Sequence, residues 1–260
     1  MSDPLAIAIE TARAAGDLLR SRFKLHGSAR RLKPDHTTLT DADLEADQLI
    51  TRAIRAAFPD EAILTEESET RMPADGRPTW VIDPIDGTTN FARGLHTWGV
   101  SIARLVDGLP SEGALYFPLL NELYSVRKGE GAQLNGEAIH TRPPDPDSND
   151  VFFTCCTRTH RRYQVDVQYK LRILGSAAYD FCAIARGATI AGFQATPHLW
   201  DLAAGWLVLE EAGGAAAVLH GPAPFPAQAG EDYGLHSYPT LMAGSAALLD
   251  TARGWVTLQA

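Results

Sequence analysis

The feature that most constrains the fold of this chain is the segment at residues 80–91, WVIDPIDGTTNF. Its apolar start predicts a buried strand that ends at Asp83, and the proline that follows favours extended backbone at that aspartate. A second carboxylate, Asp86, comes three residues later, and Gly87 permits a tight turn. The Thr, Thr and Asn after the glycine are typical of a helix N-terminus. The segment therefore predicts a strand, an acidic turn and a helix in direct succession.

The acidic turn has a chemical interpretation. Two carboxylates this close repel each other unless a cation lies between them, and without the cation one of them takes up a proton more readily. Such hard oxygen ligands favour Mg²⁺ over zinc or copper. The Gly-Thr-Thr turn adds backbone N–H groups at a helix start, where a phosphate binds readily. Together these features indicate phosphoryl chemistry. For Asp83 or Asp86 taken alone, an acidic turn with a helix cap is an equally good interpretation.

The remaining pattern mixes helices and strands. Helices are predicted over residues 3–23, from about Asp41 to Phe58, from Ser176 to about Arg186, and from just after Asp201 to Gly213-Gly214. Strands are predicted at 62–64 and 80–82, in a hairpin series from Trp98 with turns at Asp107-Gly108 and Asn135-Gly136, and at 151–155 and 170–174. A basic loop is expected at 158–162. This order predicts an α/β or α+β layered sandwich.

The segment at 143–150, PPDPDSND, is the predicted boundary, because its three prolines and three aspartates cannot continue a central strand or helix. It divides the chain into an N-terminal α+β half, residues 1–142, and a C-terminal α/β half, residues 151–260. We expect most metal ligands in the first half. The second half is expected to complete the active site of one compact catalytic unit.

Composition excludes several classes of protein. The 23 Lys and Arg against 32 Asp and Glu give a net charge of −9, which argues against a dedicated nucleic-acid or anionic-membrane binder. No apolar run approaches the ~18 residues that a membrane span needs. Three cysteines form neither a disulfide framework nor a metal pair. We therefore expect a cytoplasmic protein with no nucleic-acid or membrane partner.

The segment DPIDGTTNF resembles the signature of the inositol monophosphatase family, a group of Mg²⁺-dependent, lithium-sensitive phosphatases. Three further motifs resemble those of the family, in the family's order. They are Thr40-Asp41 preceded by Lys33 and Asp35, Glu66-Glu67-Ser68, and WDLAAGWLVLEEAGG at residues 200–214. The resemblance implies an α-β-α-β-α sandwich of the inositol monophosphatase and fructose-1,6-bisphosphatase type. It also implies hydrolysis of a small phosphorylated metabolite by metal-activated water attack, and often a homodimer.

The resemblance implies a role for each matching residue, with two or three Mg²⁺ per site. Glu66, Asp83 and the carbonyl of Ile85 would hold the first ion. Asp83, Asp86 and Asp201 would hold the second, although from sequence alone Asp201 fits a helix cap better. Glu66 would also orient the attacking water, together with Thr88 backed by Asp41. The backbone N–H groups of Gly87 and Thr88 would bind the phosphate.

Two positions depart from the family pattern. Thr65 stands where the family usually has Gly, and Gln194 stands where members that hydrolyse inositol phosphate carry a Glu that grips the ring hydroxyls. Gly175 and Ala177, in GSAA, match a substrate-lining loop. The open substrate alternatives are inositol phosphate, which Gln194 disfavours, fructose 1,6-bisphosphate, histidinol phosphate and 3′(2′),5′-bisphosphate nucleotides.

Two further alternatives stay open. A cluster of basic residues forms either a solvated face or a contact for a second phosphate. Its members are Arg158, His160, Arg161, Arg162, Lys170 and Arg172. An alternative of another class is a non-catalytic regulatory protein that retains the fold and binds a partner. The presence of all four expected metal carboxylates disfavours it.

Overall fold

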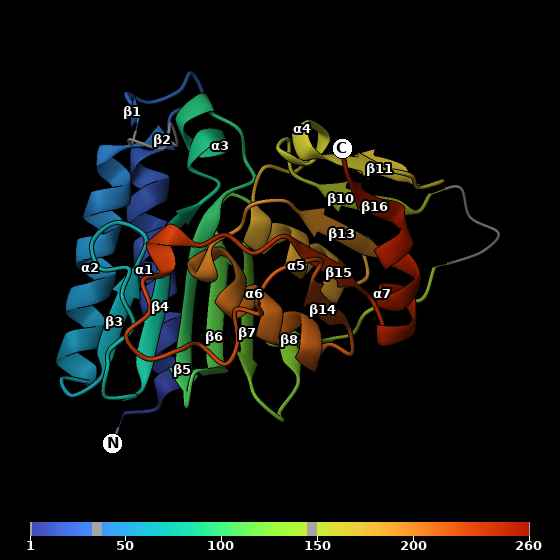
Figure 1. The fold of residues 1–260 in the computed structure, drawn as a ribbon. Helices are drawn as coiled ribbons and strands as arrows, with labels where there is room; N and C mark the ends of the chain where they lie inside the picture. Colours follow the sequence, from blue (N-terminus) through green and yellow to red (C-terminus); the bar gives the residue numbers. More distant parts are fainter. Residues whose placement is uncertain (1, 33–37, 145–149, 260) are drawn as a thin grey trace.

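The chain folds into five alternating layers of helices and strands (Figure 1). This computed structural model describes residues 2–32, 38–144 and 150–259. Two helices, a seven-stranded sheet, a second pair of helices, a five-stranded sheet and an outer helix follow one another across the molecule. The predicted α-β-α-β-α sandwich is therefore confirmed.

The larger sheet has the strand order β3-β4-β5-β6-β7-β8-β9. β3 runs parallel to β4, and every later pair is antiparallel. The turns predicted at Asp107-Gly108 and Asn135-Gly136 join β5 to β6 and β8 to β9, and all four residues have positive φ, as tight hairpin turns require. The strands span Ala62–Thr65, Thr79–Asp86, Gly99–Val106, Leu109–Phe117, Glu122–Arg127, Ala132–Leu134 and Glu137–Ile139.

Two long helices cover the outer face of this sheet, α1 at Pro4–Arg22 and α2 at Asp41–Ala57. α1 begins as its sequence predicts, because Asp3 Oδ1 accepts a hydrogen bond of 3.2 Å from the Leu5 N–H and a proline occupies the first helical position. The buried alanine and isoleucine side chains of both helices pack on the sheet around Trp80. The predicted helices over 3–23 and from Asp41 are thus confirmed within a residue or two.

The second pair of helices, α5 at Ala177–Ala185 and α6 at Leu199–Glu211, lies between the two sheets (Figure 1). The smaller sheet has the order β12-β10-β13-β15-β14, with β10 parallel to both of its neighbours. Its strands span Lys170–Arg172, Phe152–Cys155, Ala191–Gln194, Thr240–Ala243 and Ala215–Val218. The outer helix α7, Ala246–Ala252, covers its far face. The apolar faces of α5 and α6 therefore form the central core with both sheets.

Short elements complete the chain. They are α3 Thr88–Arg93, the strand pair β1 Arg31–Leu32 and β2 Thr38–Leu39, the pair β11 Tyr163–Val165 and β16 Val256–Leu258, α4 Thr159–Arg162, and two 3₁₀ turns, η1 Tyr233–Leu235 and η2 Arg253–Trp255. The basic segment at 158–162 was expected to be a loop. Four of its residues form α4, which leads directly into β11, so that expectation is wrong.

The predicted boundary at 143–150 includes residues 145–149, which lie outside the described part of the chain, as do Lys33 and Asp35 of the N-terminal motif. The division into halves at 1–142 and 151–260 stays a prediction. None of the helices in the described ranges combines the length and the apolar character needed to cross a membrane.

Candidate active site

β4 carries two of the predicted ligands on one face through a local irregularity. Val81 packs in the core between the two sheets, and strand alternation turns Asp83 to the same side. Asp83 pairs with Ser101 of β5, whereas Asp86 pairs with Gly99, so β4 has one extra residue, a β-bulge. In a regular strand, side chains three positions apart lie on opposite faces, so Asp86 would point away from Asp83. The bulge brings the two carboxylates back to one face.

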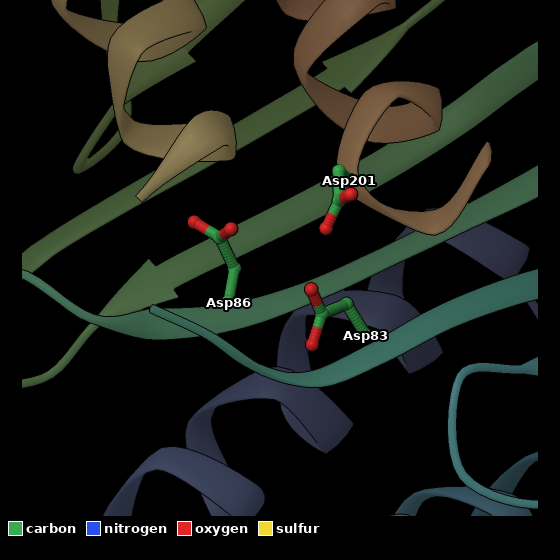
Figure 2. A group of neighbouring side chains, drawn as sticks. All are labelled: Asp83, Asp86 and Asp201. Carbon is green, nitrogen blue, oxygen red and sulfur yellow. The ribbon is translucent and has the colours of Figure 1, made fainter. Parts of the chain in front are cut away.

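α6 supplies a third carboxylate from the facing layer. The helix begins at Leu199 with His198 as its N-cap, so its predicted start after Asp201 is wrong by two to three residues. Asp201 lies in the first turn, and its Oδ2 accepts a 2.6 Å hydrogen bond from the His198 backbone N–H. Asp83, Asp86 and Asp201 point toward one another (Figure 2), and one oxygen from each lies within 4.8 Å of the other two.

The three carboxyls are held in an environment that opposes their ionisation. Burial, followed by the neighbouring charges of Glu66, Asp86 and Asp201, raises the pKa of Asp83 well above its usual value. Burial and the charge of Asp201 raise the pKa of Asp86 to about 7, and burial and the charge of Glu66 raise that of Asp201 to about 7. The positive charge of the neighbouring Arg158 acts in the opposite direction and lowers the pKa of Asp201.

This donor set fits a hard divalent cation. The polar atoms that converge here are carboxylate oxygens, and no His or Cys joins this cluster among the described residues. A cation among them would reverse both the burial penalty and the mutual repulsion, because each carboxylate then gains an opposite charge. Oxygen-only ligation favours Mg²⁺ or a similar ion over zinc or copper.

The start of α5 anchors Asp86. The Ser176 hydroxyl and the Ala178 N–H donate to Asp86 Oδ2, and the Ala177 N–H donates to Oδ1 at 3.1 Å. The sequence predicts that Ala177 belongs to a substrate-lining loop, but its backbone N–H donates to the carboxylate of Asp86 on the facing sheet. The sequence predicts Ser176 only as the start of a helix, as the usual N-cap signal of Ser before an apolar helix indicates, and assigns it no role in the site.

Glu66 follows β3 and lies beside the carboxylate cluster. β3 runs parallel to β4, so the carboxyl ends of both strands meet at one edge of the sheet, and the charge of Glu66 raises the pKa of both Asp83 and Asp201. Thr65, which departs from the family pattern, donates its hydroxyl to the buried Asp47 of α2. Thr65 in place of Gly thus links the turn that carries Glu66 to α2, and it removes none of the predicted ligands.

The carboxylate behind Thr88 is Asp43, and the interpretation that assigned this role to Asp41 is wrong. Thr88 Oγ1 lies 3.2 Å from Asp43 Oδ1 and 2.9 Å from the Ile85 carbonyl oxygen. Asp41 is 79% exposed and forms an ion pair with Arg31. The sequence holds a signal for the correct residue, because Thr40-x-x-Asp43 has the spacing of a capping box at the start of α2.

We expect Asp43→Asn to lower kcat by about 10- to 100-fold, the usual effect of losing a positioning partner, and Asp41→Asn to change it less than about twofold. Asp43 Oδ2 accepts from both the N–H and the hydroxyl of Thr40. An asparagine would therefore keep its carbonyl there and turn its NH₂ toward Thr88, which could no longer donate to it. Steady-state kinetics of the two variants would measure the difference. Equal losses in both would contradict the assignment.

Gly87 forms the turn between β4 and α3 and permits a close approach of backbone. Its φ is +89°, and a Cβ there would lie 2.9 Å from the Thr97 carbonyl oxygen and 3.3 Å from the Gly175 carbonyl oxygen. Asn90, in the first turns of α3, holds the same region together, because its Nδ2 donates to the carbonyls of Thr97 and Leu174. Asn90 thus links the turn after β4 to the loop before α5.

We expect Gly87→Ala to lower the free energy of unfolding by about 1–3 kcal/mol more than Gly76→Ala, because forced contacts of this kind typically cost about that much. Gly76 also has a positive φ, +69°, but a Cβ there would meet nothing within 4 Å. The control therefore carries the backbone strain alone. Urea unfolding of both variants would measure the difference, and similar losses would mean that the crowding at Gly87 relaxes freely.

Two cavities adjoin the carboxylates. A cavity of about 410 Å³ is lined by Glu66, Asp83, Ile85, Asp86, Gly87, Thr88, Gly175 and Asp201 among others. A second of about 480 Å³ is lined by residues that include Ala177 and Gln194. Asp41 lines a separate depression beside α1. The structure therefore places every predicted site residue except Asp41 along these two cavities, which share Gly175 and Asp201, with Ala177 and Gln194 lining the second.

Comparisons with known proteins agree with this geometry. The model described as "Inositol monophosphatase family" matches residues 1–250. The chain is 34% identical over 233 residues to the Nus factor SuhB of Pasteurella multocida, covering 85% of this chain and 87% of that one. It is 31% identical over 229 residues to the inositol monophosphatase of Mesembryanthemum crystallinum, covering 82% and 84%.

Solved structures show the same fold. The extragenic suppressor protein SuhB of Bartonella henselae superposes with a TM-score of 0.82 at 26% identity, covering 97% of this chain and 98% of that one. The IMPase of Thermotoga maritima superposes with a TM-score of 0.79 at 26% identity, covering 97% of both chains.

Proposed function

The chain belongs to the inositol monophosphatase family, and from that membership we propose that it is a Mg²⁺-dependent phosphomonoesterase that hydrolyses a small phosphorylated metabolite. The observation that carries this proposal is the convergence of Asp83, Asp86 and Asp201 from two layers of the fold. Two buried carboxyls and a third that is half-buried, all with raised pKa values, are costly unless a cation binds them.

The residues would divide between two ion positions. Glu66, Asp83 and the Ile85 carbonyl would hold one Mg²⁺, and Asp83, Asp86 and Asp201 would hold another. Bound Mg²⁺ supplies Lewis acidity, which makes a water more acidic and stabilises charge on the leaving oxygen. Thr88 already donates toward the Ile85 carbonyl and Asp43, which fixes the direction of its hydroxyl.

The chain's own groups would position the reactants. Glu66 would accept a proton from the attacking water, and the Thr88 hydroxyl oxygen would accept its other hydrogen bond. The backbone N–H groups of Gly87 and Thr88, at the positive-φ turn before α3, would donate to the phosphate oxygens. When water attacks phosphorus on the side opposite the departing alcohol, no protein nucleophile is required. Cys155 is buried and its pKa is raised to about 12, so we give this cysteine no part in the reaction.

A panel of phosphate esters tests the proposal. Inositol 1-phosphate, fructose 1,6-bisphosphate, histidinol phosphate and adenosine 3′,5′-bisphosphate would each be incubated with the protein, with Mg²⁺ or with a chelator, and released phosphate measured. We expect Mg²⁺-dependent turnover of at least one compound. We expect inositol 1-phosphate to be among the poorer substrates of the panel, because Gln194 donates its amide N–H to the buried Asp180 and offers no charged acceptor.

A second candidate function is a non-catalytic regulatory protein that retains the fold. It is supported by relatives at 34% identity that are named Nus factor SuhB rather than phosphatase. The intact carboxylate cluster favours the enzyme. Absence of Mg²⁺-dependent turnover across the panel, together with a protein partner retained by the Asp83→Asn variant, would favour the regulator.

A further inference from the structure

Arg158 lies where the two cavities beside the carboxylates meet. The cavities share several lining residues, namely Thr89, Arg158, Gly175, Thr196 and Asp201. Arg158 is exposed, and its Nη1 donates a 2.9 Å hydrogen bond to Thr196 Oγ1 in the segment between β13 and α6. This bond holds the guanidinium at the mouth shared by both cavities.

Arg158 differs from the other cations of its segment in what surrounds it. Lys170 pairs with Asp150, and the Arg172 guanidinium lies 4.2 Å from the centre of the Phe152 ring. In the described part of the chain, no carboxylate forms an ion pair with Arg158, although its charge acts on Asp201. When cations neutralise the cluster, that guanidinium has positive charge available for an anion.

The second cavity is shaped for the part of a ligand that extends beyond the carboxylates. Its walls include the apolar side chains of Leu95, Ile173, Leu174 and Pro197, and Gln194 closes its inner end. Gln194 is held by its bond to Asp180 and carries no charge. The cavity therefore offers an apolar wall, two neutral side-chain amides, those of Asn90 and Gln194, and a single lining guanidinium, which suits a compact skeleton with an anionic group.

We propose that Arg158 is a specificity-determining residue that binds a second anionic group, phosphate or carboxylate, on the alcohol portion of the substrate. This inference rests on the proposed phosphatase function. Thr196 would fix the guanidinium so that its remaining N–H groups face that anion in a forked contact, which an ammonium group cannot make. The second anion would set affinity, while the carboxylate cluster would act on the first phosphate.

Matched pairs of substrates test the inference. Fructose 1,6-bisphosphate would be compared with fructose 1-phosphate, adenosine 3′,5′-bisphosphate with adenosine 3′-phosphate, and 2-phosphoglycerate with glycerol 2-phosphate. We expect Arg158→Gln to raise KM for the dianionic member by about 10- to 100-fold, the range of a charge-assisted hydrogen bond, with little change in kcat. Arg158→Lys should lie between wild type and Gln.

Arg161→Gln is the matched control, because Arg161 lies three residues after Arg158, in the short helix α4 that Arg158 precedes, and lines neither cavity. We expect it to leave every KM within about twofold. A selective effect on the bisphosphates, or on 2-phosphoglycerate, would support the inference and identify the second group. Equal effects of Arg158→Gln on both members of each pair, with turnover intact, would overturn this inference alone. Absence of wild-type turnover on every compound would overturn the proposed function and this inference with it.

Discussion

Replacing Asp83 by asparagine is expected to lower Mg²⁺-dependent kcat by about 10³-fold, the scale on which one preorganised charge-stabilising group contributes to catalysis. Asp83 lies at the centre of the cluster, and its pKa responds to Glu66, Asp86 and Asp201 together. An amide keeps the size of the side chain but removes the charge through which both ion positions would be held. Initial rates at saturating and limiting Mg²⁺, on whichever substrate the panel identifies, would measure the loss.

Asp41→Asn serves as the control for Asp83→Asn, because it makes the same chemical change at an exposed carboxylate outside the cavity. Circular dichroism would show that both variants keep the fold. An Asp83→Asn variant with more than a tenth of wild-type kcat would contradict the role given to the cluster.

The second prediction with a large expected effect concerns how the stability of the metal-free protein depends on pH. Asp86 and Asp201 have pKa values raised from 3.8 to about 7, so the folded protein binds more protons than the unfolded chain between those limits. Their contribution to stability is complete below about pH 4 and is lost as the pH rises through about 7. We therefore expect the chelator-treated protein to melt at a lower temperature at pH 8 than at pH 5.5.

Added Mg²⁺ should reverse this loss. We expect the rise in Tm on adding Mg²⁺ to be at least about 5 °C larger at pH 8 than at pH 5.5, which corresponds to roughly 2 kcal/mol in a chain of this size. Differential scanning fluorimetry with matched ionic strength would measure it, with Na⁺ as the control for screening. Asp83→Asn should raise the metal-free Tm at pH 8, because it takes one acidic group out of the cluster of mutually repelling carboxyls. A metal-free Tm that does not fall between pH 5.5 and 8 would contradict this account.

The main helices and strands follow from local sequence rules. The helix at 3–23 has its cap, its proline and its apolar spacing in the sequence itself, and the structure has it at Pro4–Arg22. The strand-turn-helix at 80–91 likewise depends on neighbouring residues, so β4 and α3 follow in the expected order. Such features can be predicted because each is determined within a few residues.

Other parts of the site depend on contacts between distant segments. Asp41 and Asp43 are two residues apart, and the capping-box spacing from Thr40 distinguishes Asp43, but only the folded chain shows that Asp43 lies opposite Thr88. The links of Asn90 to Leu174 and of Ser176 to Asp86 join residues more than 80 positions apart in the chain. Likewise Arg158 differs from its basic neighbours through its hydrogen bond to Thr196 and its position beside both cavities. These contacts between distant segments are not contained in any periodicity or spacing of the sequence.

The anchoring of Asp86 also limits how this residue can hold an ion. A carboxylate oxygen has two lone pairs. On Asp86 Oδ2 both are occupied, by the Ser176 hydroxyl and the Ala178 N–H, while Oδ1 accepts from Ala177 alone. Asp86 therefore has a single lone pair left, on Oδ1, and could bind the proposed Mg²⁺ only as a monodentate ligand. The start of α5 would thus decide the denticity of a ligand that the facing sheet supplies.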